Sequence, residues 1–195
     1  MILETWFPTP IWYTDLTCDF EKVKQGCLRL RQQDPGRKYS NIGGWQSNDI
    51  VLSEHEEFRE LDVEIQSHCV NVCKQIDPNI KAAMHSVWVN INGPHDYNAK
   101  HSHPYSSLSG VVYVAADENS GEIVFSPPSL HQHYPLKAPN NHLFFESVQY
   151  KPRVGMMLLF PSWLEHQALP SPNSAQERIS IAINIMQSNL FKFID

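Results

Sequence analysis

The sequence predicts an α+β protein, mainly β, in which N-terminal helices support a double-stranded β-helix of the jelly-roll or cupin type. Apolar residues recur at helical spacing only within the first 80 residues, and from residue 84 they alternate with polar residues almost to the end. Histidines in the alternating part are placed to face inward. This favours the double-stranded β-helix over a plain Greek-key sandwich, the alternative that the strand pattern leaves open.

Length and composition predict one globular unit. The chain has 195 residues, of which 42% are hydrophobic and 18% charged, and it contains neither repeats nor a low-complexity segment. We therefore expect a single domain over 1–195, with a helical support region over 1–80 and a β core over 84–190. The formal net charge of -6 argues against nucleic acid or an anionic membrane as partner, because both require a concentrated basic face.

Cysteine usage and the N-terminal sequence predict a cytosolic protein in a reducing compartment. The four cysteines lack CxxC spacing, and three of them fall on apolar helical stripes, where a free thiol behaves as a small hydrophobe. Residues 1–15 show no basic segment followed by an apolar core, and no stretch of about 18 apolar residues occurs. We expect neither export nor a membrane span.

Two helices are expected in the support region. The first follows Asp19, a capping residue, and ends at a turn that begins with Asp34. The second begins with a capping box of Ser53 and Glu56 and carries one apolar stripe as far as Asp77. We expect its acidic face to be solvated.

Extended segments account for the rest of the chain. The aromatic, proline-interrupted stretch 3–13 suits an edge strand or a cover over the core. Two loops, 93–100 and 126–141, are expected to frame the mouth of a site. Strands are expected near 84–92, 108–115, 121–125, 142–150, 154–160 and 178–187.

Three histidines are candidates for one metal site. His101 and His103 are two residues apart in an extended segment, so their imidazoles point to the same side, and His166 follows a later strand. With ten histidines in the chain, chance pairs are expected, and His131 with His133 forms such a pair in a proline-rich loop. Imidazole binds Fe, Zn, Cu and Ni alike, so the ligand type does not name the metal.

Arg178 and Ser180 share one face of the last predicted strand. A guanidinium matches a carboxylate, and a neighbouring hydroxyl adds a donor. Beside an open metal site, an anion-binding site of this kind suits a co-substrate whose 2-oxo acid end chelates the metal while its far carboxylate pairs with the arginine. 2-Oxoglutarate has this structure.

Three motifs carry a resemblance to a known family. They are HxHP-x-x-x-LSG-x-x-Y from His101, FPSW-x-x-H ending at His166, and RIS from Arg178. Over its whole length the chain resembles a family of 2-oxoglutarate/Fe(II)-dependent oxygenases found in marine bacteria and phages. The resemblance implies a double-stranded β-helix, Fe(II) and 2-oxoglutarate as cofactors, and O2 as co-substrate. It also implies hydroxylation of a C–H bond in a protein side chain or small molecule, with release of succinate and CO2.

The resemblance also assigns roles to single residues. It implies that His101 and His166 bind the metal and that Arg178 holds the far carboxylate. Tyr113 matches an aromatic residue that can hydrogen-bond the same carboxylate, although it could equally be a core residue. Asn90 is a further candidate for 2-oxoglutarate binding, or it closes a turn.

One position departs from the wider superfamily, because His103 stands where an aspartate is expected. We expect His103 to be the third ligand. Alternatively it stays off the metal, and water, a halide or another side chain fills its place. Asp96 is the nearest carboxylate upstream, and Glu165 is expected to face away. Two other functions therefore stay open: a three-histidine, cupin-like metalloenzyme that does not use 2-oxoglutarate, and a non-catalytic β-sandwich whose histidines lie on the surface or in the core.

Overall fold

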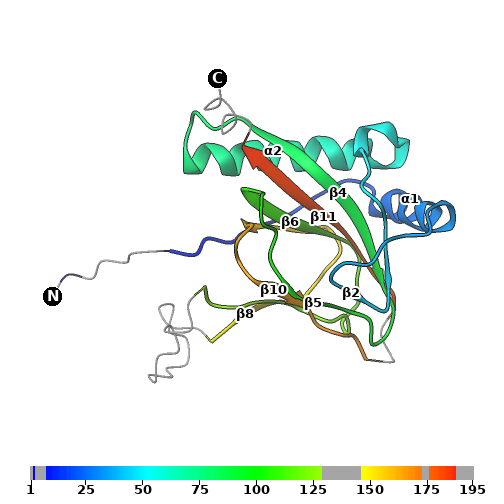
Figure 1. The fold of residues 1–195 in the computed structure, drawn as a ribbon. Coiled ribbons are helices and arrows are strands. Elements are labelled where there is room, and N and C mark those ends of the chain that lie inside the picture. Colours follow the sequence, from blue (N-terminus) through cyan, green and yellow to red (C-terminus); the bar gives the residue numbers. More distant parts are fainter. Residues whose placement is uncertain (1, 3–7, 129–145, 173–175, 188–195) are drawn as a thin grey trace.

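The protein is mainly β, with two antiparallel sheets and two α-helices in the part of the chain that the structure, a computed structural model, describes (Figure 1). That part comprises residues 2, 8–128, 146–172 and 176–187. The larger sheet has the order β1-β9-β6-β11-β4-β3, and the smaller has the order β2-β5-β10-β7-β8. The strands of the larger sheet are β1 (Trp12–Asp15), β3 (Trp45–Gln46), β4 (Ala82–Asn92), β6 (Leu108–Ala115), β9 (Met156–Pro161) and β11 (Arg178–Gln187). Those of the smaller are β2 (Asn41–Ile42), β5 (Tyr97–His101), β7 (Ile123–Phe125), β8 (Val148–Tyr150) and β10 (His166–Ala168).

The two helices cover one face of the larger sheet, and the smaller sheet lies on the other side (Figure 1). Helix α1 (Phe20–Gln33) begins as expected, because the Asp19 carboxylate accepts from two backbone N–H groups of its first turn. Helix α2 (Arg59–Ile76) supplies a second apolar stripe. Neither helix combines the length and the apolar character that a membrane crossing requires.

The capping box predicted for the second helix is wrong. Two 3₁₀ turns, η1 (Leu52–Glu54) and η2 (Glu56–Phe58), precede α2, and Phe58 occupies its N-cap without a side-chain hydrogen bond. Phe58 is fully buried, and its ring lies so close to Gly26 of α1 that an added Cβ at Gly26 would be 2.7 Å from a ring carbon. Packing of this ring against α1 therefore decides where α2 starts.

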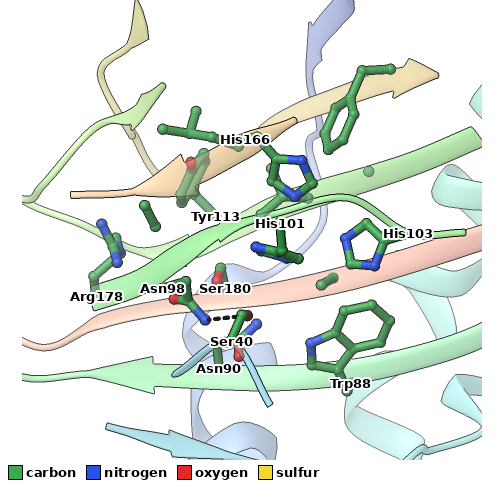
Figure 2. Close-up of a pocket in the computed structure, with 16 residues that line it drawn as sticks. Ser40, Trp88, Asn90, Asn98, His101, His103, Tyr113, His166, Arg178 and Ser180 are labelled. Carbon is green, nitrogen blue, oxygen red and sulfur yellow. Dashed lines mark hydrogen bonds between the residues drawn. The ribbon is translucent and has the colours of Figure 1, made fainter. Parts of the chain in front are cut away.

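Strict alternation gives the central strands two different faces. Odd-numbered residues of β4 and β11, such as Val89 and Ile181, join the core beneath the helices. Even-numbered ones, such as Trp88, Asn90 and Ser180, point toward the smaller sheet (Figure 2). The side of the larger sheet that faces away from the helices thus carries polar groups into the interior.

Four short strands were not predicted, β2, β3, β5 and β10, and the last two lie next to the candidate site. β5 occupies 97–101, so the second half of the segment 93–100, which was predicted to be a loop, is a strand instead. β5 and β10 are short and polar and lack an alternating apolar pattern, and they form through pairing with each other. Most of the loop predicted over 126–141 lies outside the described residues, together with His131 and His133.

The acidic face predicted for α2 is solvated only in part. Asp62 is 6% exposed and accepts from Gln66, and Glu64 accepts from the backbone and hydroxyl of Thr17. Glu64 therefore links α2 to the segment that precedes α1, whereas the bond of Asp62 lies within α2, and sequence periodicity reveals neither.

Candidate metal centre and co-substrate cavity

The three candidate histidines converge at one point between the sheets (Figure 2). His101 ends β5 and His166 begins β10, and the two are direct partners in the strand register, with ring centroids 4.4 Å apart. His103 lies beyond the end of β5, where its backbone N–H donates to Ser162 O at 2.9 Å and keeps the segment in place. One ligand atom from each residue can be chosen so that all three lie within 4.8 Å of one another.

Backbone carbonyls fix the orientation of two of these rings. Nδ1 of His101 is 2.7 Å from Ala99 O, and Nδ1 of His166 is 2.9 Å from Leu164 O. A carbonyl oxygen only accepts hydrogen bonds, so each Nδ1 carries the hydrogen and each Nε2 keeps a free lone pair. This is the arrangement in which a histidine binds a metal through Nε2.

Burial keeps the cluster uncharged. Burial, with a smaller contribution from neighbouring imidazoles, lowers the pKa of His166 to about 3 and that of His103 to about 4. Burial also lowers the pKa of His101. Neutral imidazoles at pH 7 are what a divalent cation requires as ligands.

Within the described residues, no carboxylate or thiol joins the three imidazoles. Asp96 instead accepts from the backbone N–H of Gly93 at 2.8 Å. Glu165 is exposed, 3.9 Å from Lys100, and so faces away from the cluster as expected. The donor set of three neutral nitrogens fits a first-row divalent metal such as Fe(II), Zn(II) or Cu(II).

A cavity beside the histidines is lined by the candidate co-substrate residues of the larger sheet (Figure 2). Ser180 of β11 is paired with Asn90 of β4 on one side and Tyr113 of β6 on the other, so the three form a row across three strands. Arg178 lies two residues before Ser180 on the same face. All four predicted residues therefore line the same cavity as the three histidines.

Arg178 is a buried cation with unused hydrogen-bonding capacity. It is 2% exposed, and its Nη1 donates to Gly121 O and, at 3.1 Å, to Leu169 O. Its Nη2 is buried and has no hydrogen-bond partner among the described residues. Burial lowers the pKa of Arg178, which shows the cost of keeping this charge out of water. An anion in the cavity would compensate both the charge and the unpaired N–H groups.

Tyr113 borders the same space. It is 3% exposed, and burial raises the pKa of its phenol to about 12. The hydroxyl therefore stays protonated and can donate to an anion beside Arg178. Asn90 presents a buried Oδ1 that has no partner in the described part of the chain.

Asn98 was missed by the sequence analysis, although it also lines the cavity and donates to Ser40 Oγ at 3.3 Å (Figure 2). Asn98 precedes His101 by three residues, so regular alternation would place the two on opposite faces. The register shifts between them, because two steps along β10 match three along β5. This extra residue turns both side chains to the same side. Trp88 was also missed, although it shares the alternating face of Asn90.

Several solved structures have the same fold. A viral collagen prolyl hydroxylase from Paramecium Bursaria Chlorella virus-1 matches with a TM-score of 0.62 at 16% identity, covering 90% of this chain and 94% of that one. A Pseudomonas putida prolyl-4-hydroxylase matches with a TM-score of 0.64 at 12% identity, covering 92% and 93%. HygX from Streptomyces hygroscopicus, solved with nickel and 2-oxoglutarate bound, matches with a TM-score of 0.63 at 11% identity, covering 93% and 84%. At these identities the likeness concerns the fold alone, which confirms the predicted double-stranded β-helix.

The sequence itself shows the family. Residues 86–184, just over half of the chain, match the family described as "Putative 2OG-Fe(II) oxygenase". The chain belongs to this family, as its three motifs predicted. No curated protein matches the sequence.

Proposed function

We propose that the protein is a 2-oxoglutarate- and Fe(II)-dependent dioxygenase that hydroxylates a protein side chain or a small molecule. The observation that carries this proposal is the unpaired Nη2 of buried Arg178 in the same cavity as three neutral imidazoles. A metal ligand set and an unsatisfied cation, side by side, match the two ends of a 2-oxo dicarboxylate.

Each candidate residue has a defined task in this proposal. His101, His103 and His166 hold Fe(II) through ring nitrogen atoms, and Ala99 O and Leu164 O fix the orientation of the His101 and His166 rings. When bound, Fe(II) and 2-oxoglutarate together supply the activation of O2 and the oxidation of a substrate C–H bond, with release of succinate and CO2.

The residues of the larger sheet orient the co-substrate. Arg178 forms the ion pair with its far carboxylate, and the hydroxyls of Ser180 and Tyr113 donate to the same group. Asn90 lies next to Ser180 and contributes an amide to the cavity. Because Arg178 is anchored by two backbone carbonyls, its free N–H groups are already aimed before binding.

The lack of a carboxylate among the described donors favours a second candidate: a three-histidine metalloenzyme that does not use 2-oxoglutarate. In that case Arg178 would bind a carboxylate of the substrate itself. Formation of succinate during turnover separates the two functions, because only a 2-oxoglutarate oxygenase produces it.

Anaerobic addition of Fe(II) and then 2-oxoglutarate to the apoprotein tests the main proposal. We expect the visible charge-transfer band of an Fe(II)–2-oxo acid chelate in the wild type, and much weaker binding in Arg178→Gln. Arg153→Gln is a matched control, because that arginine forms a solvent-exposed ion pair with Asp15. Bound Fe(II) without the band would favour the second candidate instead.

A further inference from the structure

A wider groove opens next to the histidine cluster. Ser40, Trp88, His101 and His103 line both the groove and the inner cavity, so the two spaces adjoin at the candidate metal site. The space open to water-sized molecules is about 60 Å³ in the inner cavity and about 560 Å³ in the groove. The inner cavity thus suits a small co-substrate, and the groove can admit a larger molecule to the same metal.

Arg37 is the most constrained charged group of this groove. Its guanidinium carbon lies 5.1 Å from the ring centroid of Tyr39 and 5.9 Å from that of Trp88. Its Nη2 donates to Asp49 Oδ1 at 2.5 Å. Two aromatic rings and one carboxylate therefore hold the guanidinium in position.

The hydrogen bonds of Arg37 are incomplete. Its Nε is buried and has no partner among the described residues. Of the two cations that line the groove, Lys100 is paired with exposed Glu165 at 3.9 Å and Arg37 with Asp49, so each has one carboxylate beside it. A guanidinium that is held in position and keeps one N–H group unpaired matches an anionic acceptor.

Trp88 links this cation to the metal site. The indole ring contacts the Arg37 guanidinium. Its centroid lies 5.6 Å from the ring centroid of His103 (Figure 2). A molecule whose carboxylate pairs with Arg37 can pack its apolar part on the indole and reach the histidines with a carbon atom. In this arrangement the substrate extends across the indole, so about the width of one indole ring separates its carboxylate from the reacting carbon.

We propose that Arg37 is a specificity-determining residue and that the substrate is a carboxylic acid, held by Arg37 at one end and packed on Trp88 toward the metal. This inference rests on the proposed function, because it names the substrate class of the same site. It differs from the task of Arg178, which lies in the inner cavity and does not line the groove.

Calorimetric titration of the 195-residue chain tests this assignment without turnover. The probes are N-acetyl amino acids with aliphatic or aromatic side chains, each compared with its carboxamide. We expect some of the acids to bind more tightly than their amides, and Arg37→Gln to weaken acid binding by about 10-fold or more while amide binding changes little. Arg37→Lys, which keeps the charge but loses the planar fork, should fall between the two.

Two matched variants locate the carboxylate. Arg178→Gln should retain the preference for acids over amides, and so should Lys100→Gln, whose lysine is paired with exposed Glu165. The assignment would be overturned if Arg178→Gln or Lys100→Gln lost the preference for acids while Arg37→Gln kept it. It would also be overturned if the wild type bound acids and amides equally, or bound no acid at millimolar concentration. Thermal melts confirm that each variant is folded. If the proposed function itself is wrong, the wild type will lack the Fe(II)–2-oxo acid absorption band, which is a separate measurement.

Discussion

His101 and His166 are direct partners across two neighbouring strands, and their imidazole rings are 4.4 Å apart. They are 65 residues apart in the sequence, and the pairing of β5 with β10 brings them together. Two of the three candidate metal ligands therefore lie on a strand pair, which gives them a rigid support, and the third, His103, lies just beyond the end of β5.

Replacement of His166 should remove the metal. We expect His166→Ala to lose most of its Fe(II), because two imidazoles cannot provide three ligands. Metal content after equilibrium dialysis measures this. His85→Ala is the control, since that histidine is exposed and lies outside the cluster. Unchanged metal content in His166→Ala would favour the non-catalytic sandwich.

2-Oxoglutarate should stabilise the metal-loaded protein through Arg178. A ligand that binds only the folded state adds about 2.7 kcal/mol at a hundredfold excess over its dissociation constant. Because Arg178 provides the unpaired donor, we expect the melting temperature to rise in the wild type and to change little in Arg178→Gln. Differential scanning calorimetry with Mn(II) measures both shifts, and equal shifts would contradict the role given to Arg178.

The metal-free protein should lose stability as the pH falls from about 6.5 to about 4.5. Burial keeps the pKa of His103 near 4 and of His166 near 3, below the ordinary value of 6.5. In this window the unfolded chain binds protons that the folded protein does not, so stability falls with pH. The slope is about 1.4 kcal/mol per pH unit for each such histidine. Urea unfolding at several pH values with a chelator present measures this slope. We expect a smaller slope in His103→Gln than in the wild type, and equal slopes in the two proteins would be evidence against the effect.

Gly110 should not tolerate a side chain. A Cβ at this position would lie 2.6 Å from Leu159 Cδ2 and 2.7 Å from Leu158 O, and the backbone oxygen cannot move freely. We expect Gly110→Ala to lower the free energy of unfolding by about 1–3 kcal/mol. Gly93→Ala is a milder control, because the nearest atom there is an Asp96 carboxylate oxygen at 3.3 Å. Equal effects of the two substitutions in urea unfolding would contradict this explanation.

Much of the site was predictable because its residues follow simple periodicities. Arg178 and Ser180 alternate on one strand, so their common face could be predicted before the strand was seen. Asn98 could not be found in this way, because the register shift on β5 reverses the expected alternation. The start of α2 was also out of reach, since it depends on where Phe58 packs against Gly26.

The sequence by itself determined the family, the fold class, and the histidines and arginine that are candidates for chemistry. These follow from local spacing and from motifs, which are properties of neighbouring residues. Only the tertiary structure decided that, within the described residues, the buried Arg178 Nη2 lacks a partner and no carboxylate joins the imidazoles. It also decided that the Arg37 guanidinium lies near the rings of both Tyr39 and Trp88. Burial and pairing depend on contacts between residues far apart in the chain, and no local pattern encodes them.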